Sequence, residues 1–108
     1  MEAEVASAIT ESELYVPLLQ ILDKAPGGFM TTAAIVVELE NLFQPEGIDA
    51  EILKNRSDTH FSQKVRNIIS HKNVPGNPIN DGLVIYHSKR HGLEITDAGR
   101  AYLKRKGL

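Results

Sequence analysis

Two clusters of polar side chains in the second half of the chain suit hydrogen bonding to nucleic acid. Amide and guanidinium groups can make paired hydrogen bonds to purine edges, and hydroxyl and ammonium groups suit phosphate oxygens. The first cluster consists of Ser62, Gln63, Lys64, Arg66, Asn67 and His71. The second consists of three consecutive residues, Lys89, Arg90 and His91. These residues are the candidate DNA-binding residues of the sequence.

The first cluster lies on a segment whose pattern predicts a helix from about Thr59 to Lys72. Its apolar residues recur at i, i+4, i+7 and i+8, and they are Phe61, Val65, Ile68 and Ile69. This spacing places them on one face of a helix. Most polar side chains of the first cluster then fall on the opposite face.

The second cluster lies at the tip of a predicted hairpin. Leu83–His87 and Leu93–Ile95 have the composition of two strands, and Ser88–Gly92 lies between them. We expect Gly92 to supply the positive φ angle that such a tip needs.

Further elements complete the pattern. Helices are expected at Val16–Lys24, Thr32–Leu42 and Asp97–Arg105. A short third segment with its own cap is expected at Ala50–Asn55, and Phe29 and Met30 are expected to be extended. Thr31 and Thr96 have the side chains of helix N-caps. Leu42, Ala98 and Ala101 are among the residues expected to face the core.

This order of elements predicts an α+β, mostly helical fold of the winged helix-turn-helix type. Three helices would form its core, a two-stranded hairpin its wing, and a C-terminal helix would follow. Residues 15–108 are expected to form the domain, and residues 1–14 an arm or short helix, since Thr10 and Glu13 have capping-box spacing. In such folds the helix before the hairpin usually lies in the major groove of double-stranded DNA, while the wing contacts the backbone or minor groove. Both clusters fall at these positions.

Charge is distributed unevenly along the 108 residues, whose net charge is −2. Residues 1–53 carry one basic and ten acidic residues, a net charge of −9, and residues 54–108 carry eleven basic and four acidic residues, a net charge of +7. Such asymmetry indicates a polyanionic partner for the second half, or chance segregation of surface charge. The chain has no cysteine and no long apolar segment, so we expect a cytoplasmic protein without a membrane partner.

The sequence offers little for catalysis. It contains no glycine-rich phosphate loop and no dinucleotide-binding fingerprint. The Asp…Glu-x-Lys motif of restriction nucleases is also absent from the sequence. His87 and His91 flank the predicted tip, but no third metal ligand is evident. We therefore expect no enzymatic activity, no cofactor and no metal ion.

The aromatic residues are expected mostly in the core. Phe29, Phe43 and Phe61 have the spacing of core residues. Tyr86 either faces the core or stacks on an extruded base.

The connection Asn73–Gly82 has two prolines and two glycines, which forbid a regular element, and its length would suit a binding loop.

Three stretches carry a family resemblance. They are Tyr15–Leu22, Phe61–Asn67 and the Ile-Thr-Asp-x-Gly-Arg run at Ile95–Arg100. Together they resemble the N-terminal domain of Mrr-type, modification-dependent restriction endonucleases of bacteria and archaea. The resemblance implies a DNA recognition module of a restriction or defence system, and the reading of methylated bases is one form of recognition that it suggests. A nuclease domain would then lie in a longer parent chain. The residues carried over are Gln63, Lys64, Arg66, Asn67, Lys89 and Arg90, and the connection Asn73–Gly82 departs from the family pattern.

Two alternatives share the predicted fold. The acidic first half would repel DNA if it lay beside the polar helix, which favours a winged helix used for protein interaction or homodimerisation. A transcriptional regulator of the same fold is the second alternative.

Overall fold

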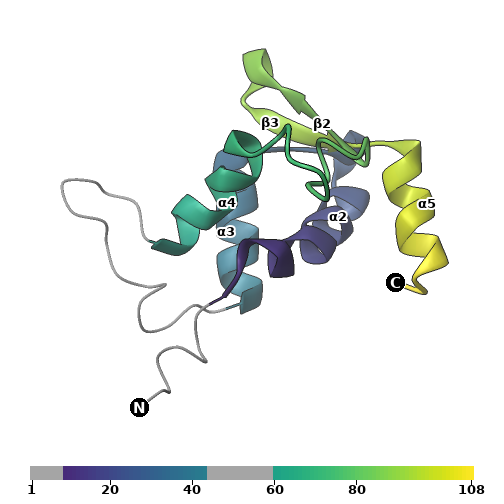
Figure 1. Cartoon of the computed structure of the whole chain (residues 1–108), viewed down its shortest axis with the longest axis horizontal. Coiled ribbons are helices and arrows are strands. Elements are labelled where there is room, and N and C mark those ends of the chain that lie inside the picture. The colour runs from purple at the N-terminus through teal and green to yellow at the C-terminus, as the bar shows by residue number, and fades with distance from the viewer. Residues whose placement is uncertain (1–8, 44–59) are drawn as a thin grey trace.

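The computed structural model describes residues 9–43 and 60–108. Its helices are α2 (Tyr15–Lys24), α3 (Thr32–Phe43), α4 (His60–Ser70) and α5 (Asp97–Arg105), and its strands are β1 (Phe29–Thr31), β2 (Val84–His87) and β3 (Gly92–Ile95) (Figure 1). A 3₁₀ helix, η1 (Glu11–Leu14), directly precedes α2. The chain is therefore an α+β protein, and the predicted helices and strands in this part agree with these bounds to within two residues. The segment expected at Ala50–Asn55 lies outside the described residues.

The sheet has three antiparallel strands in the order β1-β3-β2. Met30 and Tyr86 both pair with Leu93, which places all three side chains on one face of the sheet. The Thr32 N–H donates a hydrogen bond to the carbonyl of His91 at 2.8 Å, and this bond ties the start of α3 to the hairpin. The predicted two-stranded hairpin was therefore incomplete, because β1 adds a third strand at the free edge of β3.

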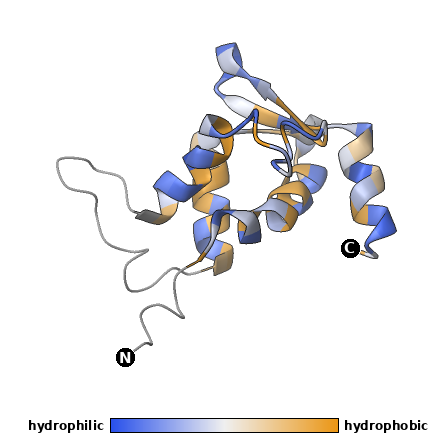
Figure 2. Ribbon diagram, viewed as in Figure 1, coloured by the Kyte–Doolittle hydropathy of each residue, from blue (hydrophilic) through white to orange (hydrophobic). Residues whose placement is uncertain are grey.

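Apolar side chains from the helices and the sheet meet in one core, toward which the orange helix faces turn in Figure 2. The core residues that are at most 1 % exposed include Leu14, Leu18, Leu19, Leu22, Ile35, Leu39, Phe61 and Ile68. Val84, Leu93 and Ile95 contribute from the sheet and Leu103 from α5. Each such side chain contributes about 1.5–3 kcal/mol of transfer free energy on burial, so this core fixes the orientation of α4 and the hairpin. Within residues 9–43 and 60–108, no helix has the length and apolar character needed to cross a membrane.

The junction between β3 and α5 explains the Thr-x-x-Gly pattern. Thr96 Oγ1 accepts a hydrogen bond from the Gly99 N–H at 3.0 Å, which confirms the predicted N-cap, and it donates to the Gly82 carbonyl at 2.7 Å. A Cβ atom at Gly99 would lie 2.4 Å from the Leu83 carbonyl oxygen. Glycine is therefore needed here because α5 starts directly against the chain that enters β2.

The connection Asn73–Gly82 contains no helix or strand, as predicted, and it folds back on the core. Asn77 is 1 % exposed. Its Nδ2 donates to the Ile68 carbonyl at 2.9 Å, and its Oδ1 accepts from the Ile79 N–H at 2.8 Å. One buried amide thus satisfies the end of α4 and fixes the turn that leads to β2.

Three predicted core residues lie at the surface. Leu42 is 58 % exposed, and Ala98 and Ala101 are also exposed. Helix α3 buries Ile35, Val36 and Leu39, and the half-buried Phe43 continues this face, so Leu42 lies at its edge. Helix α5 instead buries Gly99 and Leu103, which packs it closely on α2 and β3.

Candidate nucleic-acid interface

The outer face of α4 presents an amide pair. Gln63 Nε2 donates a hydrogen bond to Asn67 Oδ1 at 2.9 Å, one helical turn away. Gln63 Oε1 is buried and accepts no hydrogen bond from the described residues. Both side chains are half-buried, and the exposed Ser70 continues the same face. In this arrangement the Gln63 amide orients the Asn67 amide, a group of the type that can pair with a base edge.

Arg66 and Ser62 lie on one flank of α4. Arg66 is half-buried, with its Nε inside the protein surface. Ser62 is only 5 % exposed, so its hydroxyl is out of reach of a phosphate. Ser62 therefore leaves the set of candidate DNA-binding residues, because it lies about 100° around the helix from Phe61, at the border of the core face.

Lys64 and His71 lie on the other flank, where η1 packs against α4. Lys64 Nζ donates to the Ile9 carbonyl at 2.5 Å, and His71 Nδ1 lies 3.0 Å from Glu11 Oε1. Both side chains thus have partners within the chain. The sequence did not predict this contact, although the capping box of Thr10 and Glu13, whose carboxylate accepts from the Thr10 N–H at 2.7 Å, was a sign of an ordered segment.

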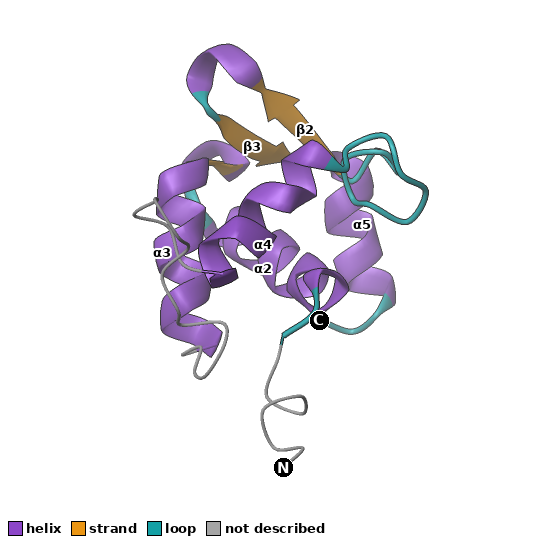
Figure 3. Cartoon of the chain, turned by 60° about the vertical axis from the view of Figure 1, so that its left-hand side comes forward, coloured by secondary structure: helices purple, strands orange, loops and turns teal. Residues whose placement is uncertain are grey.

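The three residues of the second cluster lie at the exposed tip of the β2–β3 hairpin, which extends beyond the helices in Figure 3. A 3₁₀ turn at Ser88–Arg90 forms the tip. The positive φ angle of 54° falls on His91, so the expectation that Gly92 would adopt it was wrong. Histidine is one of the residues that enter the left-handed region more readily than most.

Gly92 is needed for another reason. A Cβ atom there would lie 2.4 Å from the ring of Phe29 and 2.5 Å from the Met30 carbonyl oxygen. Phe29 therefore lies across the outer face of the sheet above Gly92, and the prediction that it is a core residue was wrong. Phe61 is buried as predicted, and Phe43 packs beside it with ring centroids 5.9 Å apart.

Phe29 also organises its neighbours on this outer face. The guanidinium carbon of Arg90 lies 3.7 Å from the centre of its ring, a cation–π contact. The ring of His87 meets it edge-on at 5.9 Å between centroids, and His87 Nε2 lies 2.7 Å from Glu94 Oε1. Sequence reasoning missed this role, since a strand of three residues is too short to show which face it buries.

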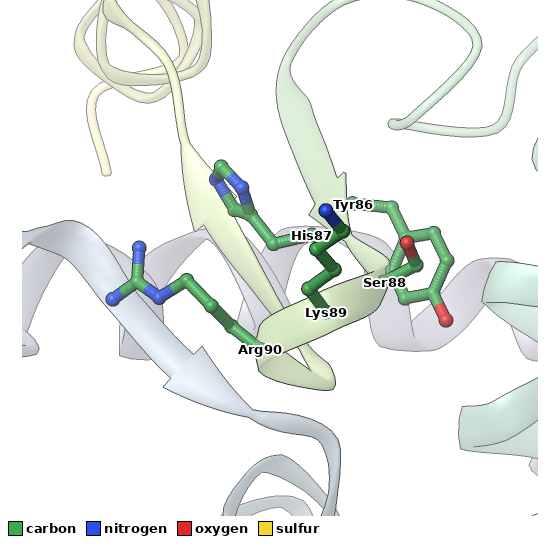
Figure 4. Close-up of a pocket in the computed structure, with 5 residues that line it drawn as sticks. All are labelled: Tyr86, His87, Ser88, Lys89 and Arg90. Atoms are coloured by element: carbon green, nitrogen blue, oxygen red, sulfur yellow. The ribbon is translucent and has the colours of Figure 1, made fainter.

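A shallow depression of about 500 Å³ at the base of the tip is lined by Tyr86, His87, Ser88, Lys89 and Arg90 (Figure 4). Tyr86 and Arg90 point to opposite sides of the hairpin. Tyr86 is half-buried and packs against the core, which favours the core interpretation of this residue over base stacking. The depression therefore has an aromatic side and a cationic side.

The C-terminal cations lie elsewhere. Arg100 Nε donates to Asp23 Oδ1 at 3.0 Å, and Lys104, Arg105 and Lys106 are exposed at the end of α5. In Figure 1, α2 lies between α5 and the pair formed by α3 and α4. These cations are therefore separate from the surface formed by α4 and the hairpin.

The comparisons with known proteins identify no relative of this chain. No family model matches the chain, and no curated protein or solved structure of significant similarity was found. The resemblance to Mrr-type endonucleases therefore remains a prediction from the sequence. Across residues 9–43 and 60–108, no group of three or more histidine, aspartate or glutamate side chains is placed to hold a metal ion.

Proposed function

We propose that this chain is a winged helix module that binds double-stranded DNA, with α4 in the major groove and the β2–β3 hairpin as the wing. The observation that carries the proposal is topological. A sheet with strand order β1-β3-β2, in which α4 is the last helix before a hairpin whose tip is Ser88-Lys89-Arg90-His91, is compatible with this fold.

The dimensions of α4 are compatible with this role. Its eleven residues make a rod about 16 Å long at 1.5 Å per residue, and a helix fits a major groove about 12 Å wide. Gln63 and Asn67 would approach base edges, Arg66 a base edge or a phosphate, and Lys89 and Arg90 the phosphates beside the helix. Binding to DNA would then depend on a few side chains held by the core.

The biological setting that we propose follows from the resemblance alone. The module would be the recognition part of a cytoplasmic restriction or defence protein, and methylated bases are the modification that it would read. Cleavage would belong to a nuclease domain elsewhere in a longer parent chain. A panel of methylated and unmethylated duplexes of one sequence would test the preference directly.

The central test is a titration of the chain with labelled duplex at several salt concentrations. We expect the logarithm of the association constant to fall with the logarithm of salt, with a slope of about −0.9 per phosphate contacted. Arg66→Ala should cost about 1–3 kcal/mol if its side chain contacts a base. Lys104→Ala is the matched control, since it removes an exposed cation from α5. A flat salt response, or equal losses in Arg66→Ala and Lys104→Ala, would contradict the proposal.

A protein-interaction winged helix remains the second candidate, because α3 has two large apolar side chains at the surface. Val37 is 53 % exposed and Leu42 58 % exposed, with the acidic Glu38 between them. Measuring the molecular mass of the purified chain in solution, together with the duplex titration, distinguishes the DNA-binding candidate from the protein-interaction candidate. A stable dimer that does not bind duplex at low salt would favour the second candidate.

A further inference from the structure

The N-terminal strap, which we define as residues Ile9–Leu14, covers the basic flank of α4. Leu14 anchors it, since this side chain is fully buried in the core. From this anchor η1 runs against α4 and brings the Ile9 carbonyl to Lys64 and the Glu11 carboxylate to His71. Two side chains from the candidate DNA-binding residues of the sequence thus meet oxygen atoms of the chain itself.

We propose that Glu11 is a positioning residue that keeps the Lys64 and His71 flank of α4 from contacting DNA phosphates. The inference rests on the proposed DNA-binding function and adds a restraint on the same surface. Glu11 Oε1 and Oε2 lie 3.0 and 3.1 Å from His71 Nδ1, so both carboxylate oxygens face the imidazole. A phosphate oxygen approaching this nitrogen must displace them.

The surroundings of Glu11 strengthen this effect. Its side chain is 20 % exposed, against 51 % for His71, so its charge is less screened by water than that of a fully exposed carboxylate. The Tyr15 hydroxyl also donates to Glu11 Oε2, at 3.4 Å. A fixed negative charge at this point repels the DNA backbone from one side of α4. Contact is thereby confined to the Gln63 and Asn67 face and to the wing.

The test measures duplex affinity and its salt dependence for the parent chain and for Glu11→Gln. This substitution removes the charge and retains the size and hydrogen-bonding capacity of the side chain. We expect binding to become about fivefold tighter at low salt, and the log–log salt slope to steepen by about 0.9, the value for one added phosphate contact. Glu11→Asp, which keeps the charge, should behave as the parent chain does.

Glu13→Gln is the matched control. It removes the same charge from the same strap, but the Glu13 carboxylate accepts hydrogen bonds from Thr10. We expect less than a twofold gain and an unchanged slope. A third variant, Glu11→Gln combined with Lys64→Ala and His71→Ala, should lose the gain, because the two side chains that would meet the phosphate are then absent.

The outcomes separate this inference from the proposed function. If the parent chain binds duplex and Glu11→Gln binds no more tightly, the inference is wrong and the proposed function stands. Equal gains in Glu11→Gln and Glu13→Gln would also overturn it, because net charge alone would then explain them. If neither the parent chain nor Glu11→Gln binds duplex at low salt, the proposed function and the inference fail together. Urea unfolding of each variant verifies that all are compared in the folded state.

Discussion

The two polar clusters of this chain, one on α4 and one at the hairpin tip, each contain a lysine, an arginine and a histidine, but their surroundings are very different. At the tip, Lys89, Arg90 and His91 are all exposed. On α4, Ser62 is buried, and Lys64 and His71 have partners in the strap. A tight turn between antiparallel strands extends beyond the packed body of the molecule, so its side chains remain accessible. The accessibility of a helix face depends instead on what the rest of the chain places against it.

The difference also concerns how easily each cluster can rearrange. Arg90 is held by a cation–π contact with Phe29, which is worth about 0.5–1 kcal/mol at an exposed site. Lys64 and His71 would have to give up hydrogen bonds to the strap before they met a phosphate. We therefore expect the hairpin to dominate electrostatic binding, and the variants below test this contrast in order of decreasing effect.

The largest effect is expected for Gly92→Ala at the base of the hairpin. The new methyl group would overlap the Phe29 ring and the Met30 carbonyl, so β1 and β3 must separate, at a cost of about 3 kcal/mol. Urea unfolding measures the change in the free energy of unfolding. Gly76→Ala is the control, since a Cβ there meets nothing within 4 Å and only its positive φ, +93°, is unfavourable, a cost of about 1 kcal/mol. Equal losses in the two variants would show that the contact with β1 is unimportant.

The next largest loss of stability is expected for Asn77→Ala, in the connection that folds back on the end of α4. It leaves the Ile68 carbonyl and the Ile79 N–H without their buried partner, and we expect a loss of about 2 kcal/mol in the free energy of unfolding. Asn80→Ala removes an exposed amide from the same connection and should cost less than about 0.5 kcal/mol. Thermal unfolding of both variants compares them, and an Asn77→Ala variant as stable as Asn80→Ala would contradict the role of this amide.

Duplex binding compares the clusters directly. Lys89→Ala should weaken binding about fivefold and make the log–log salt slope shallower by about 0.9. Lys64→Ala should change affinity less than about twofold, because its ammonium group is already bound to the Ile9 carbonyl. If Lys64→Ala had the larger effect, the strap would have to leave α4 when DNA binds, and the contrast between the clusters would hold only for the free protein.

The smallest effect concerns pH and the strap. Burial, followed by the nearby charge of Glu11, raises the pKa of the Tyr15 hydroxyl above its usual value of 10.0. The folded state therefore holds this proton more tightly than the unfolded chain does. The resulting stabilisation is fully present below pH 10 and is lost as the pH rises through the folded-state pKa. Unfolding of the parent chain and Tyr15→Phe between pH 9 and 11.5 would reveal it, as a decline that is weaker in the variant.

Much of this fold could be predicted because its signals are local. The apolar spacing of α4 and the N-caps Thr31 and Thr96 depend on residues within one or two turns, and the structure contains them as expected. The pairing of β1 with β3, the position of Phe29 and the strap contacts depend on residues far apart in sequence. No periodicity encodes them. The exposure of the candidate residues was accordingly predicted best at the hairpin tip and least well on the flanks of α4.

The pairing of β1 with β3 has a kinetic consequence. It joins Phe29 to Glu94, so the sheet closes a loop that includes α3, α4 and the connection between α4 and β2. Closing such a loop costs chain entropy that only a largely formed core can offset. We therefore expect the hairpin to acquire its final shape late in folding. Because Arg90 rests on Phe29, separation of β1 from β3 and loss of order at the tip should occur as one event in hydrogen exchange.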